Sequence, residues 1–129
     1  MSKFQRRLAV AACAALTAAA IAAIPALATQ TVKIDSKVTI STNAPAFHGQ
    51  VKSDNAACER QRKVKLFRKR SGPDKLLGKD KTNNHGKWKI VVDPLKSGAY
   101  YAKLVRREEG TAGTIFVCRG DRSKTVVID

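Results

Sequence analysis

The sequence predicts an all-β protein: a single antiparallel β-sandwich of seven or eight strands with one disulfide. Three observations carry this prediction. Residues 29–129 contain 15 Val and Ile and eight Thr against five Leu, a composition that favours strands over helices. Apolar residues recur with a period of two, which puts alternate side chains on one face of a strand. Turn-forming residues separate these segments at intervals of about 8–12 residues, as in β-sandwiches.

The start of the chain has the layout of a signal peptide. Three basic residues open it, and a run of alanine and larger apolar residues follows over residues 8–24. Ala26 and Ala28 then provide the small-x-small pattern that signal peptidase cleaves. A membrane anchor is the alternative, because a run of this length lies at the short edge of a transmembrane span. The cleavage pattern favours export, so we expect a signal peptide at 1–28 and one secreted domain at 29–129.

Eight segments have the apolar pattern of strands. They are residues 32–34, 38–40, 47–51, 64–68, 88–92, 100–104, 115–117 and 126–128. Asp35 and Ser36 separate the first two and predict a bend between them. A brief turn of helix is expected within residues 56–61. Glu109-Gly110 is one of the turn signals, which predicts that Glu108 and Glu109 lie in a turn.

Cys58 and Cys118 are the two cysteines that remain once the leader is removed. An even count in an oxidising compartment predicts a disulfide between them. The two positions are 60 residues apart. For a loop of that length the chain-entropy model gives a stabilisation of about 4 kcal/mol. The chain has no Cys-x-x-Cys motif, which disfavours a redox pair or a metal site.

Two local patterns carry a family resemblance. Residues 74–88 contain Leu-Leu-Gly followed by Thr-Asn-Asn-His-Gly-Lys-Trp, and residues 97–102 read Ser-Gly-Ala-Tyr-Tyr-Ala. Together with the apolar alternation at 64–66, they resemble transthyretin-like and carboxypeptidase-regulatory-like modules over residues 58–104.

The resemblance implies a prealbumin-like or immunoglobulin-like sandwich. In it Gly86 takes the positive φ that closes a hairpin, and the rings of Trp88 and Tyr100 enter the core. Such modules serve mostly as accessory, carrier or extracellular binding domains. The transthyretin-related hydroxyisourate hydrolase has conserved histidines and ends in Tyr-Arg-Gly-Ser. This chain ends in Val-Val-Ile-Asp, so the resemblance does not extend to that activity.

No residue pattern predicts catalysis. His48 and His85 are isolated in the sequence, and there is no Gly-x-Ser-x-Gly motif. We therefore expect no catalytic residue, no metal and no cofactor. Residues 119–121 spell Arg-Gly-Asp, the tripeptide that integrins bind, but a Gly-Asp turn before the last strand explains it without a receptor.

Positive charge is the strongest functional signal. Residues 29–129 hold 22 Lys and Arg against 10 Asp and Glu, a formal charge of +12. Strand alternation turns basic side chains outward on three predicted strands, interleaved with two aromatic rings. The candidate binding residues are Lys63, Lys65, Phe67, Lys69, Lys87, Lys89, Tyr101 and Lys103. A solvated surface that keeps an exported protein soluble is the alternative, although this much charge also repels itself across the fold.

The sequence therefore predicts a secreted, non-catalytic module that binds an extracellular polyanion or carbohydrate through a basic face. The candidate partners are an anionic wall polymer, an acidic polysaccharide, nucleic acid bound without sequence specificity, and an anionic membrane surface. A structural or subunit-pairing protein of the cell envelope is the alternative class, and a hydrolase is the third. Polyanion binding should weaken steeply with salt, whereas apolar pairing should not. The sequence leaves the oligomeric state open.

Overall fold

The computed structural model describes residues 29–129, so the predicted signal peptide lies outside the described residues. Within this range the protein is all-β, as predicted, with one short 3-10 helix, η1 (Ala56–Cys58), at the place expected for a helical turn. The strands are β1 (Gln30–Ile34), β2 (Ser36–Val38), β3 (Ser41–Asn43), β4 (Ala46–Ser53), β5 (Lys63–Arg68), β6 (Lys75–Lys81), β7 (Lys87–Val91), β8 (Gly98–Leu104), β9 (Arg107–Thr111), β10 (Thr114–Cys118), β11 (Asp121–Arg122) and β12 (Val126–Ile128).

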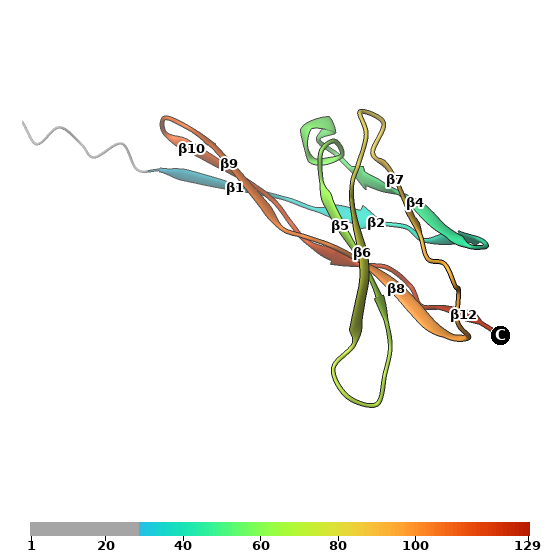
Figure 1. The fold of residues 1–129 in the computed structure, drawn as a ribbon. Coiled ribbons are helices and arrows are strands. Elements are labelled where there is room, and N and C mark those ends of the chain that lie inside the picture. The colour runs from blue at the N-terminus through green and yellow to red at the C-terminus, as the bar shows by residue number, and fades with distance from the viewer. Residues whose placement is uncertain (1–28) are drawn as a thin grey trace, which may run out of the picture.

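Two antiparallel sheets form the body of the molecule (Figure 1). In the first, the β4 sheet, β4 pairs with β7 along one edge and with β2 and β3 along the other. β2 and β3 keep one register on β4, and between them the Thr39 amide donates to the Gln50 carbonyl at 2.9 Å. They therefore act as one interrupted strand. In the second, the β5 sheet, the order is β6–β5–β8, and β11 and β12 pair with the outer edge of β8.

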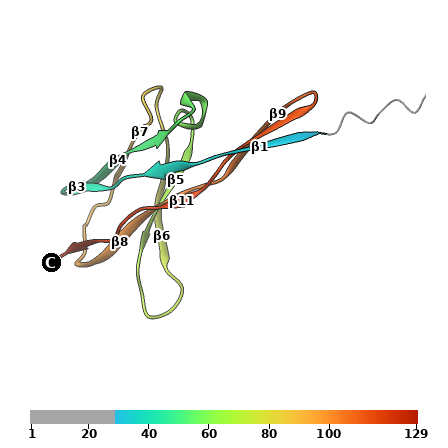
Figure 2. The ribbon, with the colours of Figure 1, turned by 180° about the vertical axis from the view of Figure 1, so that it is seen from behind.

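A three-stranded ribbon of β1, β10 and β9 projects from the body (Figures 1 and 2). In the body Lys103 on β8 pairs with Arg122 on β11, and in the ribbon Arg107 on β9 pairs with Cys118 on β10. Both pairs have the same register. The segment β8–β9 and the segment β10–β11 are therefore the two arms of one long interrupted hairpin. β1 pairs with β10 in parallel, which departs from the predicted all-antiparallel pairing. Both strands run from the ribbon tip toward the body, and this shared direction makes them parallel.

The ribbon also corrects the predicted turn at Glu109. Glu108 and Glu109 lie within β9, opposite Val117 and Phe116, and the turn falls further along the chain at Gly113, whose φ is +93°. β10 supplies the pairing partners that extend β9, and sequence propensity for a turn at Glu109-Gly110 does not outweigh this pairing.

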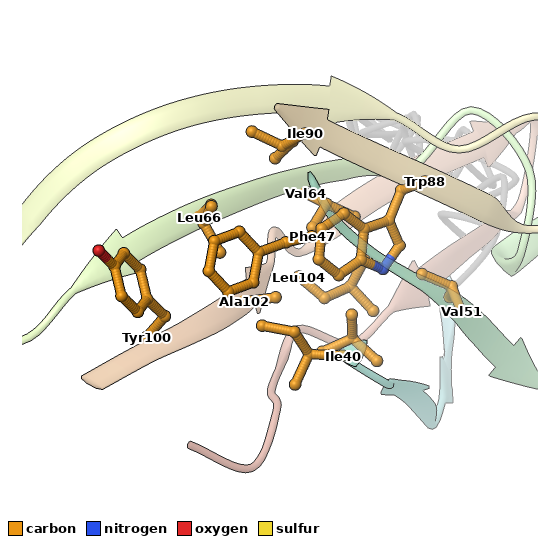
Figure 3. Packing of buried hydrophobic residues seen from close by; sticks show 11 residues of the cluster. Ile40, Phe47, Val51, Val64, Leu66, Trp88, Ile90, Tyr100, Ala102 and Leu104 are labelled. Carbon is orange, nitrogen blue, oxygen red and sulfur yellow. The ribbon is translucent and has the colours of Figure 1, made fainter. Parts of the chain in front are cut away.

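One hydrophobic core joins the two sheets (Figure 3). The β4 sheet contributes Phe47, Trp88 and Ile90 among others, and the β5 sheet contributes residues that include Leu66 and Tyr100. The Phe47 and Tyr100 rings lie 4.8 Å apart, and the Trp88 indole donates to the Thr39 carbonyl at 3.2 Å. The predicted inward positions of Trp88 and Tyr100 are therefore confirmed, with 2% and 1% of each residue exposed.

The turn after β6 links the two sheets and is not a hairpin within one of them. β6 pairs with β5, whereas β7 pairs with β4, so the predicted hairpin is wrong although its turn chemistry is right. Gly86 has a φ of +73°, and the Asn83 side chain accepts from the Lys87 amide. Asp80 adds a link, because its carboxylate accepts from the Lys89 amide at 2.8 Å.

The disulfide and one buried arginine fasten the ribbon to the body. Cys58, at the end of η1, is bonded to Cys118, at the end of β10, as predicted. Next to it the fully buried Arg62 guanidinium donates to the Ser36 hydroxyl and to four backbone carbonyls, those of Cys58, Val105, Cys118 and Arg119. Desolvation, with a smaller repulsion from Arg107, lowers the pKa of Arg62 to about 10, so it stays charged at neutral pH.

Candidate functional site

The outer face of the β5 sheet carries a row of cations that crosses four neighbouring strands. Lys65 on β5 lies opposite Lys79 on β6 and opposite Lys103 on β8, and Lys103 in turn lies opposite Arg122 on β11. We call these four residues the basic row. Directly opposed side chains in an antiparallel sheet have Cβ atoms about 5 Å apart, and like charges in such pairs are destabilising. The fold thus holds four cations side by side against their mutual repulsion.

Further cations extend this surface. Lys63 on β5 and Lys81 on β6 lie opposite each other. Each is two residues away from the basic row on its strand. The ion pairs among residues 29–129 join Arg106 to Glu108, Arg107 to Glu109 and Arg119 to Asp35. None of them involves a member of the basic row.

An apolar row runs beside the basic row on the same face. Phe67 on β5 lies opposite Leu76 on β6 and opposite Tyr101 on β8. The Phe67 and Tyr101 rings are stacked with centroids 5.5 Å apart, and the Arg122 guanidinium lies 3.7 Å above the Tyr101 ring. Only 7% of Tyr101 is exposed. Its ring is therefore covered by Phe67 and by Arg122, and it is not available to a ligand.

Tyr101 also anchors the loop between β5 and β6. Its hydroxyl donates to the Asp74 carboxylate at 2.5 Å. This hydrogen bond lowers the pKa of Asp74, and it raises the pKa of Tyr101 because the neutral phenol is the donor. The one acid beside the apolar row is thus already engaged by a protein partner.

A hollow of about 390 Å³ opens at the end of the basic row. Lys103, Arg106 and Arg122 line it together with Gly120. Asp121 also lines it, but its carboxylate accepts from the Val38 amide at 2.9 Å and is occupied within the fold. Arg106 is already paired with Glu108, so Lys103 and Arg122 are the two lining cations without an ion-pair partner among residues 29–129.

The structure brings together six of the eight predicted binding residues. Lys63, Lys65, Phe67, Lys69, Tyr101 and Lys103 belong to the β5 sheet or to the loop that follows β5. Lys87 and Lys89 lie on β7 in the β4 sheet, on the other side of the core. Sequence reasoning missed Lys79, Lys81 and Arg122. Lys79 and Lys81 alternate within residues 75–81, and this pattern could have indicated an outward-facing basic strand. The position of Arg122 depends on the long-range pairing of the hairpin, which no local pattern indicates.

The Arg-Gly-Asp tripeptide is built into the fold. Arg119 forms an ion pair with Asp35 at 3.2 Å, and the Asp121 carboxylate accepts from the Val38 amide. A Cβ atom at Gly120 would lie 2.8 Å from the Leu104 carbonyl oxygen, so close packing requires glycine there. Packing therefore accounts for Gly120 and a hydrogen bond for Asp121, whereas Arg119 forms an exposed ion pair.

Among residues 29–129, no cluster of His, Cys, Asp or Glu could hold a metal ion, and no helix is long and apolar enough to cross a membrane. Comparison with models of known protein families and with the sequences of characterised proteins gives no match.

Proposed function

We propose that this protein is a secreted, non-catalytic module that binds extracellular polyanions through the outer face of its β5 sheet. The basic row is the observation that carries the proposal. Directly opposed like charges weaken a sheet. The basic row repeats this arrangement across four strands, with Lys79, Lys65, Lys103 and Arg122 side by side. Among residues 29–129 none of the four forms an ion pair. A bound polyanion would relieve this repulsion.

Binding would be Coulombic, and the affinity would depend on the density of negative charge along the ligand. Neighbouring strands are about 4.8 Å apart, so the four cations span about 14 Å across the sheet. A linear polyanion laid along the basic row would release counterions from several anionic groups at once. Because Tyr101 is covered by Phe67 and Arg122, stacking of nucleic-acid bases on its ring is unfavourable. This favours an acidic polysaccharide or another anionic polymer recognised by charge alone.

We infer that the two sheets form an immunoglobulin-like or prealbumin-like sandwich. When interrupted strands are merged, three strands (β1–β3, β4 and β7) face four (β6, β5, β8–β9 and β10–β12) across the core. Seven strands in two sheets, paired antiparallel apart from β1 with β10, are compatible with the immunoglobulin-like architecture. The positive φ of Gly86 and the buried Trp88 support the resemblance to transthyretin-like modules.

Export is part of the proposal. The disulfide is consistent with an extracellular location, because such bonds persist in oxidising compartments. The signal-peptide pattern supports the same destination. N-terminal sequencing of protein recovered from the medium should begin at Thr29. Protein that retains Met1 and stays with the membrane would contradict export.

A structural, subunit-pairing role is the second candidate, and the ribbon favours it. β1 and β9 each pair only with β10 among the described strands, so both leave an unpaired edge. Such edges are templates for pairing with another chain. Sedimentation over a range of protein concentrations tests this role, since a salt-resistant oligomer would support pairing and a monomer would contradict it.

The central test compares the double variant Lys65→Glu with Lys103→Glu against the unaltered mature protein. The probes are heparin and single-stranded DNA over a series of salt concentrations. For DNA, the log–log salt slope should fall by about 1.4, since two lost contacts contribute about 0.7 each. The matched control is Lys33→Glu with Lys96→Glu, which changes the net charge equally at exposed positions outside the β5 sheet. If the two double variants bind alike, the basic row is only a solvated surface.

A further inference from the structure

We propose that the outer face of the β4 sheet is a second polyanion site, so that one molecule bridges two polyanion chains. This inference rests on the proposed function but goes beyond it, because a protein with one basic face binds a polyanion without joining it to another. The bound chemistry is the same at both faces: a linear polymer that carries repeated anionic groups.

Four exposed lysines define this second face. Lys37 on β2 lies opposite Lys52 on β4, which repeats the like-charge pairing of the basic row. Lys87 and Lys89 on β7 lie opposite Gln50 and His48 of β4. Alternation along each strand sends all four side chains outward, because their neighbours Val38, Val51, Trp88 and Ile90 are buried in the core.

Most of the ten acidic residues are held by protein partners or lie outside the outward-facing strand positions of the two sheets. Of the ten, Asp80 accepts from the Lys89 backbone amide and Asp121 from the Val38 amide, and Asp74 is held by Tyr101. The others lie in loops, in the ribbon or at the chain end; they are Asp35, Asp54, Glu59, Asp93, Glu108, Glu109 and Asp129. A surface adapted only for solubility intersperses both signs of charge. Here the outward-facing strand positions of both sheets hold cations and hydroxyl, amide, imidazole or apolar side chains. At one end of the second face Asp35 and Asp54 line a hollow with Lys37 and Lys52, and Asp35 is ion-paired with Arg119.

The two faces point in opposite directions. The β4 and β5 sheets pack on a common core, and sheets in such an arrangement are about 10 Å apart. Lysine side chains extend outward from each sheet, so the two bound polymers would lie on opposite sides of the domain. A polymer bound to one face therefore leaves the other face open to a second chain.

A two-step capture experiment tests bridging. The mature protein is loaded on immobilised heparin, excess protein is washed away, and fluorescent heparin is then passed over the surface. The unaltered protein should capture the soluble heparin. The double variant Lys52→Glu with Lys87→Glu should still bind to the immobilised heparin. The amount of fluorescent heparin captured per mole of bound protein should, however, fall to background. The control Lys33→Glu with Lys96→Glu should capture normally, and titration with a heparin octasaccharide should give two sites on a protein monomer.

The outcomes distinguish this inference from the proposed function. Failure of the unaltered protein to load on heparin at all overturns the proposed function. Normal loading without capture, together with one octasaccharide site, overturns bridging and leaves the first site standing. Capture that survives reversal of Lys52 and Lys87 also overturns it, because bridging would then come from self-association of the protein. Thermal unfolding of each variant shows that it retains its fold.

Discussion

Lys65 on β5 lies directly opposite Lys103 on β8, with both side chains on the outer face of the β5 sheet. Lys65 also lies opposite Lys79, so it has a like charge on either side. This arrangement opposes folding, and under the proposed function it favours anion binding. Stability and polyanion binding should therefore respond to substitution in opposite directions.

Lys65→Glu should stabilise the fold while it weakens polyanion binding. The substitution converts two repulsive cross-strand pairs into attractive ones, and we expect the free energy of unfolding to rise by about 1 kcal/mol at low salt. The gain should shrink as salt screens the charges. Urea unfolding at two salt concentrations measures it. Lys33→Glu, an exposed control in β1 that lies opposite Val117, should change stability by no more than about 0.5 kcal/mol. An equal or lower stability for Lys65→Glu would show that the lysines do not repel appreciably.

Arg62→Met should destabilise the protein severely. The substitution removes the shared donor of one hydroxyl and four carbonyls, and unsatisfied buried acceptors cost about 1–3 kcal/mol each. Since some acceptors will find water, we expect a loss of about 3 kcal/mol or more in the free energy of unfolding. Arg60→Met is the matched control, because Arg60 is exposed. Similar unfolding midpoints for the two variants would contradict a structural role for the Arg62 guanidinium.

The Tyr101–Asp74 hydrogen bond should contribute to stability only within a defined pH range. The pKa of Asp74 is lowered from 3.8, so its contribution is complete above pH 3.8 and is lost as pH falls through the folded-state pKa. The pKa of Tyr101 is raised from 10.0, so its contribution is complete below pH 10.0 and is lost as pH rises through the folded-state pKa.

Subtracting the unfolding free energy of Tyr101→Phe from that of the unaltered protein isolates this bond. The difference should be flat across neutral pH and should decrease at both extremes. In Asp74→Asn the acidic decrease should disappear, because the amide does not titrate in this range. A pH-independent difference would contradict coupling between the two groups.

Reduction of the Cys58–Cys118 disulfide should lower the free energy of unfolding by about 4 kcal/mol, from the chain-entropy model for a separation of 60 residues. Replacing both cysteines with serine should have a similar effect. Denaturant unfolding with and without reductant gives the value. An unchanged midpoint would mean that Arg62 and strand pairing hold the ribbon without the bond.

Gly86→Ala should cost at least about 1–2 kcal/mol, the penalty for a left-handed conformation at a residue with a Cβ atom. The new Cβ would also lie 2.6 Å from the Val51 carbonyl oxygen. Gly72→Ala is the control, since no atom lies within 4 Å of its Cβ position. Equal thermal midpoints for the two variants would show that the turn between the sheets adapts freely.

The strand content, the disulfide and much of the core can be predicted from the sequence alone. Period-two alternation depends on the pleat, which is local, so Val64, Leu66, Trp88 and Tyr100 are recognisable as inward residues without knowledge of their partners. Residues 29–129 hold two cysteines, which allows one pairing between them. The excess of cations is likewise a property of composition alone.

The grouping of the charged strands, in contrast, depends on the folded arrangement of the chain. Lys65 and Lys89 have the same alternation in the sequence, yet one belongs to the β5 sheet and the other to the β4 sheet. The assignment depends on which strands pair across long separations, as does the meeting of Lys103 with Arg122 through the long hairpin. The burial of Arg62 could not be predicted for the same reason. The groups that accept hydrogen bonds from its guanidinium come from four separate parts of the chain. Pairing and enclosure are non-local, and a local pattern of residues does not encode them.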